Sequence, residues 1–156
     1  MSQPPDVQLE GLYGDLILQH YRDPHNRQPL IAPDLSVHEF NPFCGDRVDL
    51  EIKLDSQTRV LETSADAEGC SIIQASASML SDLLKGKTLK EIASLAVTFL
   101  SMMEGKEIEV ESMVRLGELD SLQVVRRYPV RIKCALLPWT ALEAVSYTHL
   151  TLPTKA

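Results

Sequence analysis

Two neighbouring segments with different hydrophobic periods constrain the fold of this chain most strongly. From Arg47 to Leu54, apolar and charged residues alternate strictly, which is typical of a β-strand with one buried face. A turn at residues 55–57 and a weaker strand over residues 58–67 complete a predicted antiparallel hairpin. After Gly69 and Cys70 the apolar residues recur at helical spacing instead. The sequence therefore predicts a hairpin that is followed at once by a buried helix.

Helical spacing of apolar residues recurs along the chain. The predicted helices cover residues 12–21, 72–86, 88–105, 119–125 and 130–145. Thr88 and Glu91 form a capping box that opens the third of these helices. Pro138 should kink or restart the last one. Residues 23–43 are expected to form an ordered loop with room for an extended piece, and residues 106–113 a short strand or a loop.

The composition is that of a folded, acidic protein. At 156 residues, with 44% hydrophobic and 24% charged residues, the chain is long enough to bury one ordinary core. Its 15 basic and 22 acidic residues leave a net charge of −7, so we expect neither a nucleic-acid partner nor a membrane partner. The first residues lack the pattern of a secretory signal, and the most apolar window, residues 92–103, is too short to span a bilayer.

We expect a single domain over residues 1–145. The last eleven residues, SYTHLTLPTKA (146–156), lack charge pairing and helical spacing, and they resemble vector- or adapter-derived read-through. They are expected to form a non-native or disordered tail, and His149 is therefore not considered a functional residue.

The chain has three cysteines, Cys44, Cys70 and Cys134, which lie far apart in the sequence. Because the number is odd and no secretory signal is present, a reducing, cytoplasmic compartment is expected and a disulfide framework is not. The spacing does not match a paired C-x-x-C zinc motif. Reactive thiols, metal ligands and small buried hydrophobes all remain open as roles for these residues.

The position of each cysteine is more informative than the spacing. Cys44 lies just before a strand and two residues from Asp46, and Cys70 lies where a helix N-terminus would lower its thiol pKa. Cys134 falls off the centre of the apolar stripe of the last helix, with Arg131 one turn away on its side. Each cysteine alone is explained by a filler or inert role, but the three together with Asp46 favour one shared metal ion.

Three thiolates and a carboxylate form a tetrahedral donor set that suits zinc. Such a centre carries a formal negative charge, and the cationic residues Arg131, Lys133 and Arg47 lie beside the candidate ligands in the sequence. A carboxylate is a harder and less tightly held zinc ligand than a fourth thiolate would be. The site could therefore open by losing one ligand, which would expose a thiolate able to attack sulfur.

The histidines are weaker candidates for metal ligands than the cysteines. His20 is expected to belong to the first helix, where it anchors that helix or contacts a partner, and His25 follows it in the same segment. His38 is expected to be solvated.

Four segments carry a family resemblance. The stretches LILQHYRDPHNR, NPFCGDRV, EGCSIIQASASML and RYPVRIKCALLPW, in this order, resemble the SufU and IscU proteins of iron–sulfur cluster assembly from Leu12 to Leu142. The chain is similar to the SufU branch in two respects. Lys133 stands where scaffold-type IscU proteins carry a histidine, and an insertion over residues 106–128 separates the second and third cysteines.

The resemblance implies an α/β (α+β) fold in which a small three-stranded antiparallel sheet packs against several helices. It also implies a zinc ion held by Cys44, Asp46, Cys70 and Cys134. SufU-type proteins accept persulfide sulfur from a SufS-type, PLP-dependent cysteine desulfurase, which they stimulate, and they serve the downstream Suf cluster-assembly proteins.

By the same resemblance, a histidine of the desulfurase takes a zinc position and releases the first cysteine. Cys44 would then be the sulfur acceptor, and Arg131 would assist the released thiol.

The rival function is a scaffold that assembles and transfers a transient [2Fe–2S] cluster on the same residues. A purely structural zinc module is a third possibility. A zinc hydrolase is disfavoured, because no histidine or glutamate stands beside the cysteines as a general base.

Overall fold

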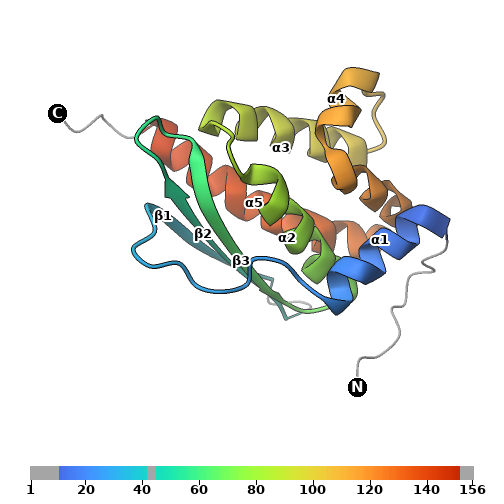
Figure 1. The fold of residues 1–156 in the computed structure, drawn as a ribbon. Coiled ribbons are helices and arrows are strands. Elements are labelled where there is room, and N and C mark those ends of the chain that lie inside the picture. Colours follow the sequence, from blue (N-terminus) through green and yellow to red (C-terminus); the bar gives the residue numbers. More distant parts are fainter. Residues whose placement is uncertain (1–10, 42–44, 152–156) are drawn as a thin grey trace.

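A computed structural model describes residues 11–41 and 45–151 of the chain, apart from the side chains of residues 12 and 145–151. The elements in chain order are α1 (Gly11–Arg22), β1 (Leu35–Asn41), β2 (Asp46–Leu54), β3 (Val60–Glu68), α2 (Ser71–Leu84), α3 (Leu89–Met103), α4 (Val110–Arg115), the 3-10 helix η1 (Gly117–Arg127) and α5 (Pro129–Thr151). The described helices gather on one face of the sheet, where α2 and α5 pack directly against the strands (Figure 1).

The sheet is antiparallel with the strand order β1-β2-β3. The alternating residues of β2 behave as the sequence predicts, since Val48, Leu50 and Ile52 are fully buried while the residues between them are partly exposed. The predicted hairpin is formed by β2 and β3. β1 is the extended piece of the segment that we expected to be mostly loop, and it pairs with β2 over its whole length. The implied three-stranded sheet is thus confirmed.

Small residues let α2 lie close to its neighbours. Between Ala75 and Ser78 this helix presents only alanine and serine, all of them buried, and it contacts β3, α1, α5 and η1. The Ser76 hydroxyl donates a 2.7 Å hydrogen bond to the carbonyl oxygen of Ala135, which joins α2 to α5. These contacts fix the N-terminal end of α2 relative to α5, and both helices carry candidate metal ligands.

Three elements differ from the sequence-based expectation. Residues 110–115 form α4 where a strand or loop was expected, and none of its side chains is buried, so apolar spacing carried no signal there. The predicted helix at residues 119–125 is a longer 3-10 helix, η1. Finally, α5 continues through Pro138 without a restart and reaches Thr151 instead of ending at Val145. Burial of Pro138 and Trp139 against the core offsets the one hydrogen bond that the proline removes.

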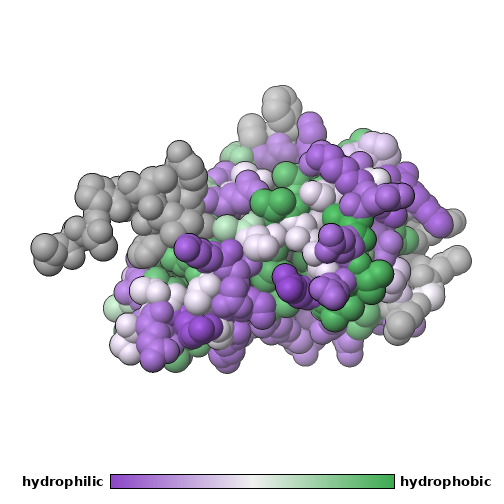
Figure 2. Space-filling view, turned by 90° about the horizontal axis from the view of Figure 1, so that it is seen from above, coloured by the Kyte–Doolittle hydropathy of each residue, from purple (hydrophilic) through white to green (hydrophobic). Residues whose placement is uncertain are grey.

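The outer surface of α3 and α4 carries exposed apolar side chains. Figure 2 shows hydrophobic residues on this side of the molecule, surrounded by hydrophilic ones. Val97 on α3 and Val110 and Val114 on α4 are among the large hydrophobic residues that remain exposed. Among the described helices, none combines the length and apolar character needed to cross a bilayer.

The capping box at the start of α3 is present as predicted. The Thr88 hydroxyl accepts a hydrogen bond from the Glu91 backbone N–H, and the Glu91 carboxylate accepts one from the Thr88 backbone N–H. Thr88→Ala should lower the free energy of unfolding by about 1 kcal/mol, because the cap satisfies otherwise unpaired N–H groups. Urea denaturation followed by circular dichroism measures this change. Thr140→Ala, at an exposed position inside α5, is the matched control and should cost little; equal losses in both variants would contradict the assignment.

Candidate metal centre

Three of the four predicted ligands meet at one end of the sheet. Asp46 is the first residue of β2, Cys70 is the N-cap of α2, and Cys134 lies in the second turn of α5. One carboxylate oxygen and the two sulfur atoms lie within 4.8 Å of one another. Asp46 and Cys134 are each 3% exposed, while Cys70 is partly exposed. Residues of one strand and two helices, far apart in the sequence, therefore form a compact donor set.

The fourth predicted ligand, Cys44, lies outside the described residues. Gly45 follows it directly, and the backbone N–H of Gly45 donates a 2.8 Å hydrogen bond to the carbonyl oxygen of Asn41. This bond ties the start of β2 to the end of β1, next to Asp46. The role of Cys44 as a ligand stays a prediction.

The Asp46 carboxylate is buried with an unsatisfied oxygen. Its Oδ2 atom has no hydrogen-bond partner among the described residues. A buried carboxylate oxygen without a donor or a cation is strongly unfavourable, because burial removes its water. Two sulfurs and one carboxylate oxygen within 4.8 Å of one another are donor types that zinc prefers. The described residues therefore fit a zinc ion.

Gly69 makes room for this carboxylate. Its φ angle is +141°, and a Cβ added there would lie 2.8 Å from Cγ of Asp46 and 2.9 Å from Cγ2 of Ile73. Both the backbone conformation and the lack of space thus require glycine. The Gln74 side chain donates a 3.0 Å hydrogen bond to the Gly69 carbonyl and holds the β3–α2 junction in place. The sequence pattern alone did not predict this role, although a glycine at the switch from strand to helix period was the available signal.

The thiol pKa values of Cys70 and Cys134 are shifted in opposite directions. A hydrogen bond from Cys134 is the largest of the effects that lower the pKa of the Cys70 thiol to about 6, and the backbone N–H groups of Ile73 and Ile72 add to it against the opposing effect of burial. The hydrogen bond to Cys70, burial and the neighbouring Asp46 raise the pKa of Cys134. Without metal, Cys70 is therefore the thiolate and Cys134 keeps its proton. The contribution of the α2 N-terminus agrees with the sequence-based expectation.

A cation stands beside the sulfurs, as expected. The Arg131 guanidinium lies one turn before Cys134, and its Nη1 donates to the Cys134 sulfur at 3.9 Å. Cys134 itself is buried among core residues, although the helix pattern placed it off the centre of the apolar stripe. Cys134 is buried in spite of this position because the edge of the stripe faces Cys70 and Asp46, which lie on other elements, and not solvent.

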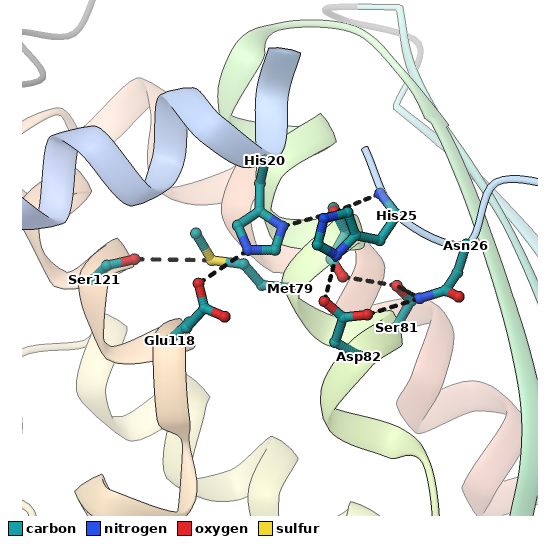
Figure 3. Close-up of polar contacts among 9 residues, drawn as sticks. His20, His25, Asn26, Met79, Ser81, Asp82, Glu118 and Ser121 are labelled. Atoms are coloured by element: carbon teal, nitrogen blue, oxygen red, sulfur yellow. Dashed lines mark hydrogen bonds and ion pairs between the residues drawn. The ribbon is translucent and has the colours of Figure 1, made fainter. Parts of the chain in front are cut away.

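A second cluster of possible ligands surrounds His20 (Figure 3). Ligand atoms of His20, His25 and Asp82 lie within 4.8 Å of one another. Both ring nitrogens of His20 are nevertheless hydrogen-bonded, Nδ1 to the Ser78 hydroxyl at 2.7 Å and Nε2 to Glu118 at 3.1 Å. These bonds join α1 to α2 and η1, which confirms that His20 anchors the first helix.

His25 and His38 each pair with a carboxylate. His25 Nδ1 contacts Asp82, and the His25 backbone N–H donates to the same Ser78 hydroxyl that His20 uses. His38 pairs with Asp49 on the outer face of the sheet, where its side chain is largely exposed. The expected solvation of His38 is confirmed, and its ring also contacts the Asp49 carboxylate, which the sequence did not indicate.

Known proteins resemble this chain over most of its length. A family model, the NifU-like N-terminal domain, matches residues 12–135. The chain belongs to this family. Among its relatives is the zinc-dependent sulfurtransferase SufU of Bacillus subtilis, 41% identical over 88% of this chain and 91% of that protein. The iron–sulfur cluster assembly scaffold protein IscU of Streptococcus pyogenes is 35% identical over 92% of this chain and 91% of that protein.

Solved structures share the fold of this family member. A protein of unassigned function superimposes with a TM-score of 0.79 and 34% identity, covering 87% of this chain and 97% of its own. A proposed iron–sulfur cluster assembly scaffold protein of the SUF system from Fervidobacterium islandicum gives a TM-score of 0.78 and 28% identity, covering 85% and 94%. The resemblance to SufU and IscU proteins, and the α/β fold that it implied, are both confirmed.

Gly69→Ala should weaken metal binding without unfolding the domain. The new methyl group would push the Asp46 carboxylate away from the sulfurs, so we expect zinc affinity to fall by roughly tenfold or more. Competition with a chromophoric chelator measures the affinity. Gly86→Ala is the matched control, because Gly86 shares a positive φ of +81° but has nothing within 4 Å of an added Cβ. Equal zinc affinity in the two variants would contradict the role of Gly69 in making room for the Asp46 carboxylate.

The pH dependence of thiol alkylation tests the charge state of Cys70. In metal-free Cys44→Ser protein, alkylation of Cys70 by iodoacetamide should follow thiolate formation with a midpoint near pH 6, well below the ordinary value of 9.0. The rate should therefore be nearly constant above neutral pH and fall as the pH drops through 6. Peptide mapping assigns the modified residue, and urea-unfolded protein is the control. A midpoint near 9 in the folded protein, or faster modification of Cys134, would refute the assignment.

Proposed function

We propose that this protein is a zinc-dependent sulfur acceptor that serves a SufS-type cysteine desulfurase in iron–sulfur cluster assembly. The single observation that carries the proposal is that ligand atoms of Asp46, Cys70 and Cys134 lie within 4.8 Å of one another, while the buried Asp46 carboxylate has an oxygen without a hydrogen-bond partner among the described residues. Similarity to the zinc-dependent sulfurtransferase SufU of Bacillus subtilis supports it. The sulfur would pass to downstream Suf cluster-assembly proteins in the cytoplasm.

Zinc would be held by Cys44, Asp46, Cys70 and Cys134. When bound, the ion would keep its thiolate ligands deprotonated at neutral pH. The chain contributes the alignment of these ligands, because Asp46 is held by the ladder of β2, Cys70 by the first turn of α2 and Cys134 by the buried side of α5. Cys44 is the ligand that would be released to accept sulfur, while Asp46 would remain bound to the zinc.

Cys44 is the proposed acceptor. Cys134 is buried inside α5 and Cys70 begins α2, whereas Cys44 belongs to the segment that joins β1 to β2. Its thiolate would attack the terminal sulfur of the desulfurase persulfide. A new S–S bond forms to Cys44 as the S–S bond within the desulfurase breaks, and the desulfurase cysteine leaves as a thiolate. The step needs no external oxidant or reductant.

Arg131 is proposed to assist the released thiol. Its guanidinium lies 3.9 Å from the Cys134 sulfur, so its positive charge already acts on the metal ligands. A fixed cation at this distance favours the thiolate form of a nearby cysteine. The residue therefore helps keep Cys44 nucleophilic when that side chain is not bound to zinc.

The second candidate function is a scaffold for a transient [2Fe–2S] cluster. Similarity to the IscU scaffold protein of Streptococcus pyogenes favours it, and thiolates are suitable cluster ligands. Lys133 argues for the sulfur acceptor instead, because it occupies the position directly before Cys134 where the scaffold branch carries a histidine. A lysine is ordinarily protonated at neutral pH, so it is a poor ligand for zinc or iron.

Sulfur transfer is tested with purified components. Zinc-loaded protein, a SufS-type desulfurase and L-cysteine should yield one added sulfur on Cys44, located by mass spectrometry of a non-reducing digest. Cys44→Ser should abolish both this sulfur and the stimulation of desulfurase turnover. Ser56→Ala, in the exposed turn between β2 and β3, is the control and should behave as the unmodified chain.

Three outcomes would overturn the proposal. Persulfide on Cys70 or Cys134 but never on Cys44 would refute the assignment of the acceptor. Unchanged desulfurase turnover in a destabilised Cys44→Ser variant would favour a structural zinc module. A stable visible chromophore that displaces zinc stoichiometrically during anaerobic reconstitution with iron would favour the scaffold.

A further inference from the structure

The outer edge of β3 has an open position at Thr63. The backbone N–H of Ala65 donates to the carbonyl of Asn26 at 2.8 Å, on the side of β3 that faces away from β2. Backbone groups of an antiparallel strand point alternately to its two sides, so those of Thr63 also point away from β2. Among the described residues, neither the N–H nor the carbonyl of Thr63 has a recorded hydrogen-bond partner on this edge.

The chain covers this edge on both sides of the open position. Val60 pairs with the segment after α2, where its N–H donates to Lys87 at 2.9 Å and its carbonyl accepts from Gly86 at 2.8 Å. On the other side, Ala65 pairs with Asn26. Thr63 is only 8% exposed, and its buried hydroxyl oxygen also lacks a hydrogen-bond partner among the described residues. An unpaired buried polar group is unfavourable, so Thr63 is suited to form hydrogen bonds with a ligand.

A groove of about 1000 Å³ lies over this position. The loop that follows α1 forms one wall, the ends of β2 and β3 form the floor, and the last turn of α2 forms the other wall. Its volume is at the upper end of the range of roughly 300–1,000 Å³ that is typical of ligand sites. The groove therefore has space for a short stretch of extended polypeptide beside the strand.

The charges of the groove favour an acidic ligand. Asp82 is already hydrogen-bonded by His25 and Asn26, and Arg27 is paired with Asp66 outside the groove. Two lysines remain without a carboxylate partner in the described part of the chain. These are Lys53, whose Nζ reaches only the Ile31 carbonyl at 3.4 Å, and Lys85 at the end of α2. Glu62 and Asp82 are the anionic lining residues and Arg27, Lys53 and Lys85 the cationic ones, which leaves the groove a net charge of +1.

An apolar rim completes the site. Ile31 lines the groove and is 87% exposed, and Pro29 and Leu30 adjoin it. A ligand that pairs with the strand edge presents alternate side chains to opposite sides. One set can contact this apolar rim while the other reaches the lysines.

We propose that this groove binds an extended, acidic peptide segment of a partner protein, which adds to the edge of β3 at Thr63. Strand addition uses main-chain hydrogen bonds for affinity and alternate side chains for specificity. Thr63 would supply the backbone pair, Lys53 and Lys85 the charge selectivity, and Ile31 the apolar contact. The proposal does not depend on the metal centre or on the proposed function.

Nuclear magnetic resonance of the ¹⁵N-labelled, zinc-loaded full chain tests this site. The probe is the peptide acetyl-Glu-Val-Glu-Val-Glu-amide, which alternates acidic and apolar side chains. Titration should shift the Thr63 amide signal and slow its exchange with solvent, with little change at Cys70. No shift at Thr63 at millimolar peptide would overturn the proposal.

Matched arms separate the contributions. The Lys53→Glu, Lys85→Glu double variant changes only side chains at the groove and should bind the acidic peptide roughly tenfold more weakly, or worse, while binding the analogue Lys-Val-Lys-Val-Lys more tightly. Thr63→Val should weaken binding several-fold by removing the hydroxyl, with folding checked by thermal denaturation. Free glutarate that produces the same Thr63 shift would show a small-anion site and refute the peptide assignment. Equal binding of acidic and basic peptides by the unmodified chain would refute it as well.

Discussion

The structure at its functional end depends on one electrostatic constraint: a carboxylate is buried beside two sulfurs without a donor for its second oxygen. Asp46 is held there by the β2 ladder, and the missing Cβ of Gly69 leaves the space it occupies. A protein does not bury such a group without compensation, because the loss of hydration is large. A shared cation is the compensation that fits the donor atoms, and zinc is the ion they suit best.

The rest of the fold keeps this donor set in register. α2 and α5 bring one sulfur each, and the hydrogen bond from Ser76 to the Ala135 carbonyl joins the two helices within two turns of those sulfurs. Farther along α5, Trp139 stacks on Phe99 of α3 with ring centroids 4.5 Å apart, which packs the second layer of helices against the first. Interactions of this kind link distant segments, so the positions of the candidate ligands depend on the packing of the core.

The two ends of α2 have different chemical roles. Its N-terminus carries Cys70, whose pKa is lowered first by the hydrogen bond from Cys134 and further by the backbone N–H groups of Ile73 and Ile72. Its C-terminal half carries Ser78, whose hydroxyl accepts a hydrogen bond from the His25 backbone N–H and is hydrogen-bonded to His20 Nδ1. It also carries Asp82, and Lys85 follows at its end; both line the groove at the open edge of β3. One buried helix thus connects a site suited to sulfur chemistry with a separate surface suited to recognition of a peptide.

Local pattern determined much of this protein. Strict alternation predicted β2, the change of period after Gly69 predicted α2, and the Thr88–Glu91 pair predicted the start of α3, because each signal depends on neighbours in sequence. The family resemblance added the third strand and named the ligands. α4 escaped prediction because none of its side chains is buried, and α5 passed through Pro138 because core packing outweighs one lost backbone hydrogen bond.

The sequence alone thus determined the main elements and, through residue types, the candidate ligands. Only the tertiary structure decided that Asp46, Cys70 and Cys134 share one point, that Gly69 yields the space for the carboxylate, and that Thr63 lies at an uncovered strand edge. Each of these facts depends on distances between segments that are remote in the chain. Periodicity describes which face of an element is buried, but it contains no information about which other element that face will meet.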